Sequence, residues 1–262
     1  MKTSKDILKD YCGAAAYKVA MSKTKLLVSG MFAGAFIAFG AFGSQVAAAS
    51  FLDPGLGRFI GACVFATGLS MVVIVGAELF TGNSLLMTAL LEKKITAGAM
   101  LRSWGIVYLG NLIGAAVVAA LVVTSQLPGM FDGALAQTMV STALAKGHLT
   151  FIDGLFRGIL CNVLVCLAVW MNLFASEPGG KIVALFLPTM LFVLCGFEHC
   201  VANMYFIPAG FMTSKIYAIP SDVATLRYIF SNLLPVTIGN VIGGAGIVAW
   251  WLHFLYGERT HS

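Results

Sequence analysis

Length, composition and charge exclude a soluble protein. The chain has 262 residues, of which 59% are hydrophobic and only 10% are charged, and its mean hydropathy is +0.92. About a quarter of the residues in a soluble domain are charged, so a surface with this few charges cannot face water. At about 20 apolar residues per span, the chain has room for about six membrane helices joined by short loops. We therefore predict a single membrane domain over residues 1–262.

Six apolar segments between the charged residues are the candidate spans. Their side chains do not alternate between apolar and polar, as the strands of a membrane barrel would, so the predicted fold is an all-α membrane protein. The predicted helices lie near 26–50, 59–91, 101–124, 151–174, 181–212 and 227–256. Residues 1–25 precede them as an amphipathic segment, with a short surface helix over 5–20. The apolar side of that helix would carry Ile7, Leu8, Tyr11, Ala15 and Val19.

The positions of Lys and Arg predict the orientation in the membrane. An even number of spans places both termini on one side. If that side is cytoplasmic, eleven of the 16 Lys and Arg residues lie in inner segments and five in outer ones, as the positive-inside rule requires. We therefore expect a multi-pass protein of the inner (cytoplasmic) membrane with cytoplasmic N- and C-termini. The net charge of +5 is then mostly a signal for orientation, and no aromatic and basic residues interleave as in nucleic-acid binding.

Two pairs of matching segments reveal an internal repeat. Gly76, Glu78 and Asn83 of the second span recur at the same spacing as Gly196, Glu198 and Asn203 of the fifth. The spans that follow contain Gly110-Asn111-Leu112-Ile113-Gly114 and Gly239-Asn240-Val241-Ile242-Gly243. Two pairs in the same order predict two three-helix repeats, 26–124 and 151–256. Because each repeat has three spans, the second enters the bilayer from the opposite face, and the repeat is inverted.

The second and fifth spans are predicted to be broken helices. A continuous helix over 59–91 would be about 50 Å long at 1.5 Å per residue, whereas the hydrocarbon core is about 30 Å thick. Free N–H and C=O groups at a break are tolerated only where they line a cavity. Paired broken helices in an inverted repeat therefore indicate a substrate path at mid-membrane, and the N-terminal ends of the half-helices favour an anion there.

A few polar side chains within or beside the spans are candidates for this path. His199 is the only histidine well inside the predicted bilayer, and an imidazole can exchange a proton near neutral pH. Thr81 falls at the break of the other repeat, from which its hydroxyl could reach His199. Lys146 lies in the predicted outer loop before the fourth span, where it would attract anions. The structural alternatives are a packed histidine, a helix cap and a surface lysine.

Other residues near the breaks also allow two interpretations. Glu78 and Glu198 are either proton carriers or acceptors for backbone N–H groups of the broken loops. The asparagines in the spans either bind substrate or join helices. The apolar residues are either core and lipid-facing side chains or hydrophobic constrictions that block hydrated ions; they are Phe65, Leu69, Phe80 and Phe192. The six cysteines form no C-x-x-C pair and are predicted to be buried and unreactive, so we expect no metal and no cofactor.

Several of these motifs resemble those of the formate/nitrite transporters. They are Glu78-Leu79-Phe80-Thr81-Gly82-Asn83, Asn162-Val163-Leu164-Val165-Cys166-Leu167-Ala168-Val169-Trp170, Gly196-Phe197-Glu198-His199-Cys200-Val201-Ala202-Asn203-Met204 and Pro235-Val236-Thr237-Ile238-Gly239-Asn240. The resemblance covers roughly residues 7–256 and departs at Cys200, where Ser is common. It implies an aquaporin-like protomer in a homopentamer, with a pore in each protomer.

The resemblance also implies a role for each site residue. His199 and Thr81 would form the central site, with Lys146 as the outer lysine and Asn162 as its polar companion. Phe65, Leu69 and Phe192 would form one constriction, and Leu79 and Phe80 the other. Glu198 and Asn240 would hold the broken loops.

The functional hypothesis is passage of formate, with proton exchange at His199, by a protein that is not an enzyme. Nitrite or hydrosulfide on the same scaffold is an alternative, because each is the small monovalent anion of a weak acid. A more distant alternative is an intramembrane protease, since His199-x-x-x-Asn203 occurs in such enzymes. That alternative needs a Gly-x-Ser-Gly nucleophile, which none of the predicted spans contains.

Overall fold

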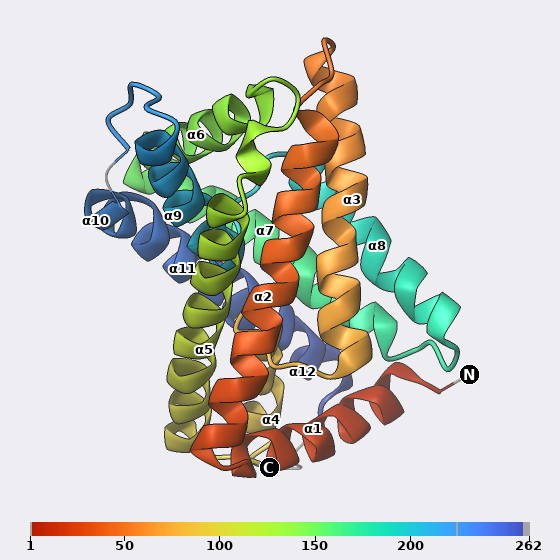
Figure 1. Ribbon diagram of the computed structural model, residues 1–262. Coiled ribbons are helices and arrows are strands. Elements are labelled where there is room, and N and C mark those ends of the chain that lie inside the picture. The colour runs from red at the N-terminus through yellow and green to blue at the C-terminus, as the bar shows by residue number, and fades with distance from the viewer. Residues whose placement is uncertain (1, 224, 259–262) are drawn as a thin grey trace.

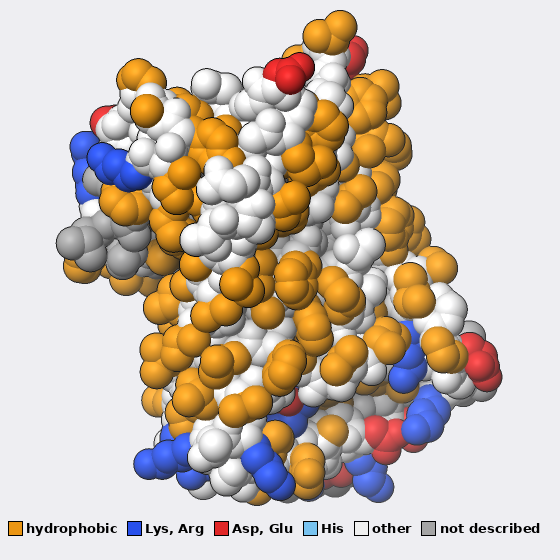
Figure 2. Space-filling model, in the orientation of Figure 1, with side chains coloured by type: hydrophobic (Ala, Val, Ile, Leu, Met, Phe, Trp, Pro, Cys, Tyr) orange, Lys and Arg blue, Asp and Glu red, His pale blue; other side chains and the backbone are white. Residues whose placement is uncertain are grey.

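Long helices run side by side through the molecule, and both ends of the chain lie at the same end of it (Figure 1). The computed structural model describes residues 2–223 and 225–258, and within these ranges the regular elements are all helical. We call the end that carries the chain termini the terminal end, and the opposite end the distal end. Hydrophobic side chains cover the middle of the visible face, whereas charged ones lie toward its two ends, above all the terminal end (Figure 2). This distribution suits a protein whose middle lies in lipid.

The first repeat consists of three spans, of which the second is broken. Its helices are α2 (Lys23–Ala48), α3 (Pro54–Val75), the short η1 (Gly82–Leu85) and α4 (Leu86–Leu91), and α5 (Ala97–Thr124). The chain leaves α3 at Gly76, which adopts a left-handed conformation with φ of 81°. A left-handed residue ends a helix by turning the chain away from its axis, and glycine does so without steric cost.

The second repeat has the same organisation. It contains α7 (Phe151–Asn172), the half-helices α8 (Pro178–Leu194) and α9 (Cys200–Ile216), and a last span over Phe230–Tyr256. That span follows α10 (Thr225–Tyr228) and begins one residue into η3 (Ile229–Leu233). It continues through α11 (Leu234–Val241), η4 (Ile242–Ala249) and α12 (Trp250–Tyr256). Gly196, with φ of 72°, again stands at the break. The predicted all-α fold with broken second and fifth helices is confirmed.

The glycines of the repeated Gly-Asn-x-x-Gly motif let helices approach closely. A Cβ on Gly114 would collide with the backbone oxygen of Met31 in α2, and one on Gly243 would collide with that of Ile159 in α7. Small residues are enriched where membrane helices pack because they bring the backbones together. The two copies of the motif thus join the third span of each repeat to its first.

Helix starts differ from the predicted ones because capping residues, not charges, determine them. The second and third spans begin at residues 54 and 97 instead of 59 and 101. Asp53 accepts a hydrogen bond from the N–H of Leu56, and Thr96 accepts one from that of Ala99. Such N-caps satisfy backbone donors that the first helical turn leaves free. The charged residues taken as boundaries therefore lie inside the helices.

The connection between the repeats is not the outer loop that the sequence predicted. After the short turn η2 (Leu127–Gly129), residues Ala134–Gly147 form the helix α6, which crosses the distal end beside α9 (Figure 1). Its inner face buries Leu135, Met139, Val140 and Ala143. A 14-residue helix is too short to span a bilayer, so the hydropathy pattern gave no reason to expect it.

At the terminal end, α1 (Ser4–Ala20) packs against the ends of the spans. Thr3 and Asp6 form a capping box at its start, and the apolar side chains predicted for one face are all buried, together with Cys12. The prediction that all cysteines are buried is wrong for Cys195, which is exposed at the end of α8, and Cys63 is only half-buried.

Cys12 provides a test of this packing. Burial raises the pKa of its thiol to about 11, and only the thiolate reacts with a maleimide. In a variant that retains only this cysteine, we expect labelling at least about tenfold slower than at an exposed position of the same helix. A matched control is Ala14→Cys combined with Cys12→Ser, because Ala14 is exposed. Equal labelling rates in the folded protein would contradict the packing of α1.

Candidate functional site

The two breaks meet at a hydrogen bond between Thr81 and His199. Thr81 Oγ1 lies 2.8 Å from His199 Nε2, and both side chains are buried, at 0% and 3% exposed. His199 Nδ1 accepts the N–H of Ala202 at 3.1 Å and so caps α9. Because Nδ1 acts as an acceptor, the neutral imidazole carries its proton on Nε2 and donates it to the hydroxyl of Thr81. The arrangement holds one exchangeable proton at the junction of the repeats.

Aromatic rings pack on both breaks. The ring of Phe192 stacks on His199 with centroids 5.8 Å apart, and Phe65 meets Phe192 edge-on at 5.7 Å. Leu69 is buried one turn after Phe65 on α3. At the other break, Leu79 and Phe80 precede Thr81 and are buried; Phe80 packs edge-on against Tyr108 at 4.9 Å. Of the predicted constriction residues, Phe192, Leu79 and Phe80 therefore lie beside the Thr81–His199 pair in space or in sequence, and Phe65 packs on Phe192.

Each broken loop is held by the asparagine of the repeated motif. Asn240 donates to the backbone oxygens of Gly158 and Glu198, at 2.8 and 2.9 Å, and accepts the N–H of Cys200 at 2.9 Å. Asn111 donates to those of Gly30 and Glu78, at 2.8 and 3.0 Å, and accepts the N–H of Phe80 at 2.9 Å. In each repeat, two of the three bonds supply partners for backbone groups of the broken loop in a buried region, and the third ties the asparagine to a glycine of the first span, Gly30 in α2 or Gly158 in α7.

Lys146 is not a free lysine in a loop. It lies in the last turn of α6, where its Nζ is 3.0 and 3.1 Å from the two carboxylate oxygens of Glu198. Glu198 also accepts hydrogen bonds from Asn203 at 2.6 Å and Asn232 at 3.4 Å. These donors are all side chains and not the backbone N–H groups that the sequence suggested. A carboxylate with this many donors is better suited to accept hydrogen bonds than to carry a proton.

The first repeat contains a counterpart that the sequence did not indicate. Glu78 lies 3.1 Å from the Nζ of Lys18 and accepts a hydrogen bond from Asn83 at 2.8 Å. Lys18 belongs to α1, which is outside the repeat, so no sequence alignment of the two repeats could have found it. The inverted repeat predicts only that the two glutamates have equivalent environments. In the structure, each glutamate forms an ion pair with a lysine of a helix outside the repeats, Lys18 of α1 or Lys146 of α6.

Asn162 has partners other than the predicted one. Its amide group donates to the backbone oxygens of Thr81 and Asn240, at 3.2 and 2.6 Å, and to Ser84 Oγ at 3.0 Å. Lys146, for which the resemblance implied Asn162 as the polar companion, instead has its backbone oxygen bonded by Asn232. Asn162 lies mid-way along α7, whereas Lys146 ends a helix at the distal end, so the two do not meet.

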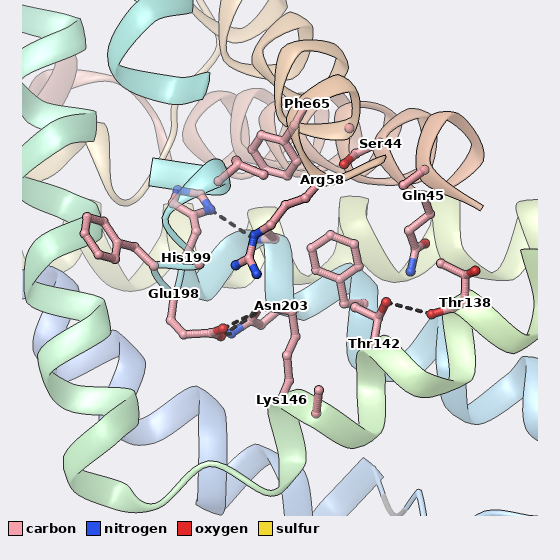
Figure 3. A pocket seen from close by; sticks show the side chains of 18 of the residues that line it. Ser44, Gln45, Arg58, Phe65, Thr138, Thr142, Lys146, Glu198, His199 and Asn203 are labelled. Carbon is pink, nitrogen blue, oxygen red and sulfur yellow. Dashed lines mark hydrogen bonds and ion pairs between the residues drawn. The ribbon is translucent and has the colours of Figure 1, made fainter. Parts of the chain in front are cut away.

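A cavity of about 650 Å³ opens at the distal end and reaches His199. We call it the distal cavity. Phe192 lies in its wall against His199. Phe65, Lys146 and Glu198 lie in the same wall (Figure 3). The side chain of Arg58, which no motif of the sequence indicated, also points into it (Figure 3). A small solute entering from this end thus meets charged groups first and then aromatic rings at the buried imidazole.

Fold and site together define a multi-pass helical membrane protein with a path that leads to a buried imidazole. The family model described as Formate/nitrite transporter matches residues 5–254, and this chain belongs to that family. The formate channel FocA of Haemophilus influenzae is 37% identical, over 96% of this chain and 93% of its own length. FocA of Escherichia coli (strain K12) is 34% identical, over 95% and 93%.

Two solved structures have the same fold. One, titled a pentameric formate channel with formate bound, is 30% identical, with a TM-score of 0.79 over 90% of this chain and 98% of its own. The other, an FNT family ion channel, is 31% identical, with a TM-score of 0.84 over 97% and 99%. The family confirms the resemblance drawn from the motifs around Thr81 and His199.

Proposed function

We propose that this protein conducts formate through a pore in each protomer of a homopentamer, with proton exchange at His199. The observation that carries the proposal is the buried Thr81–His199 pair at the inner limit of the distal cavity. Relatives named formate channels, and a neighbour titled pentameric with formate bound, support the substrate and the assembly. We further propose that the protein lies in the inner membrane with its termini in the cytoplasm, and that it acts as a channel or transporter without enzymatic activity.

Protonation allows formate to pass the apolar part of the path. Moving a carboxylate from water to a place between rings such as Phe65 and Phe192 costs much free energy, because the charge loses its hydration. Neutral formic acid has no charge, so its desolvation costs far less. As an imidazolium, His199 can transfer the Nε2 proton to a formate oxygen, which leaves a neutral imidazole and formic acid. The Thr81 hydroxyl can then donate to the vacated Nε2 lone pair. A proton from solution restores the imidazolium.

The cap on α9 opposes the charged form of His199. An imidazolium has a proton on each nitrogen, so Nδ1 would have to give up the N–H of Ala202, which it accepts at 3.1 Å. Positive charge at His199 is therefore favoured only when acid or an anion nearby stabilises it. This coupling predicts formate flux that rises as the pH falls.

Fluxes of formate, nitrite and hydrosulfide in proteoliposomes, measured as a function of pH, test the proposal. We expect saturable formate flux that increases as the pH falls from about 8 to about 5, because a lower pH favours the imidazolium form of His199. Empty liposomes measure the passive leak of each neutral acid and provide the control. Flux of nitrite or hydrosulfide without flux of formate would overturn formate as the substrate, and formate flux equal to the leak would overturn transport.

A further inference from the structure

The distal cavity has a positive charge that its lysine does not supply. Its wall contains three cationic side chains and one carboxylate, namely Arg58, Lys146, Arg157 and Glu198. Lys146 and Glu198 form an ion pair at 3.0 Å, and both side chains are largely buried, at 14% and 7% exposed. An ion pair of this geometry has little net charge to offer a distant anion. The remaining positive charge of the wall belongs to the two arginines.

Arg58 is placed to meet a solute that enters the cavity. It lies in the first turns of α3, is exposed, and forms no ion pair or hydrogen bond through its side chain within residues 2–223 and 225–258. Its guanidinium lies directly against Gly196, where an added Cβ would collide with Arg58 Nη2. Figure 3 shows the side chain pointing into the cavity on the side of His199 and Glu198. The glycine at the break therefore leaves room for this guanidinium beside the path.

Arg157 brings a second guanidinium to the same wall from α7. Its side chain is exposed and has no ion-pair partner among the described residues, while its backbone oxygen accepts the N–H of Glu198 at 3.2 Å. That bond ties this turn of α7 to the broken loop. Asp153, one turn earlier, accepts hydrogen bonds from Thr150 in a capping box instead of pairing with Arg157. Arg157 thus remains free to interact with an anion.

We propose that Arg58 and Arg157, and not Lys146, capture the anion at the distal mouth. This inference rests on the proposed transport of formate. A guanidinium presents parallel N–H donors that match the two oxygens of a carboxylate, which a lysine cannot do. Unpaired charges at a cavity mouth also raise the local concentration of anions. Capture there places formate in the cavity that ends at His199, and Lys146 remains the partner of Glu198.

The experiment measures entry from each face separately. We reconstitute three variants, namely Arg58→Gln, Arg157→Gln and the double variant. Initial formate uptake is measured in proteoliposomes that are separated by the orientation of the inserted protein. For entry at the distal face, we expect the KM of each single variant to rise about threefold to tenfold, and that of the double variant further, with Vmax within about twofold of wild type. The KM for entry at the terminal face should not change. Arg58→Lys should restore only part of the distal affinity, because it keeps the charge without the paired donors.

Salt and a remote charge provide the controls. The KM of wild type for formate entry at the distal face, here the distal KM, should rise with ionic strength. That of the double variant should rise less, because the two charges that salt would screen have been removed. Lys215→Gln removes one positive charge from an exposed position of α9 outside the cavity wall and should leave the distal KM unchanged. An unchanged distal KM in the double variant, or an equal rise at both faces, would overturn the inference while formate transport stands. Absence of saturable formate flux in wild type would instead overturn the proposed function.

Discussion

Replacing His199 by asparagine or phenylalanine is expected to lower the formate flux about a hundredfold and to remove its dependence on pH. Neither side chain can take up and release a proton between about pH 5 and pH 8. The two variants differ in what they keep. Phenylalanine retains a flat ring against Phe192, whose centroid lies 5.8 Å from that of His199, but it cannot accept the N–H of Ala202. Asparagine retains an oxygen that can cap α9, because asparagine is among the preferred N-cap residues.

This pair of variants separates proton exchange from helix capping. Formate flux in proteoliposomes is measured between about pH 5 and pH 8, and unfolding is followed in detergent. We expect His199→Phe to be less stable than His199→Asn by about 1 kcal/mol, the usual value of a cap, while both lose the pH-dependent flux. A His199→Asn variant with the wild-type pH profile would contradict proton exchange at this residue, whatever its stability.

Replacing Asn240 by leucine is expected to destabilise the protein strongly. The side chain of Asn240 is fully buried and forms three hydrogen bonds to the backbone, two with Glu198 and Cys200 at the second break and one with Gly158 in α7. Leucine has a similar size but would remove the partner of the Glu198 oxygen and of the Cys200 N–H, whereas the Gly158 oxygen keeps its place in the helical bonding of α7. Each buried polar group that loses its partner costs about 1–3 kcal/mol. The sum amounts to several kcal/mol and exceeds what a typical substitution costs.

Two further asparagines serve as matched comparisons. Asn111→Leu removes the equivalent three bonds from the first repeat and should be as damaging as Asn240→Leu. Asn172 is also buried, but its side-chain oxygen has no partner among the described residues, so Asn172→Leu should have a much smaller effect. Thermal unfolding in detergent, followed by the loss of the monodisperse peak in size-exclusion chromatography, measures all three. If Asn240→Leu were no less stable than Asn172→Leu, the asparagines would not be what holds the breaks.

Much of the fold followed from the sequence because a bilayer imposes strict rules on a chain. Apolar segments must be helical, a segment over 59–91 is too long for one crossing, and a break is tolerated only beside a cavity. The repeated Gly, Glu and Asn then located both breaks at equivalent positions. These constraints are local or depend on segment length, so they can be recognised before the packing is known. The same constraints directed attention to Thr81 and His199, which the structure places 2.8 Å apart.

The sequence could not show which charges neutralise each other, because partners far apart in the chain are chosen by packing. Lys146 looked like a free lysine until α6 placed it against Glu198, and Lys18 reached Glu78 from a helix outside the repeat. Arg58 gave no signal at all, since a single arginine near the start of a span resembles any boundary residue. The scarcity of charge thus established by itself that the protein lies in a membrane, and the repeated Gly, Glu and Asn showed where its helices break. Tertiary structure alone decided which of the few remaining charges are paired and which are left to meet an anion, since an ion pair depends on distances of a few ångströms that no spacing along the chain encodes.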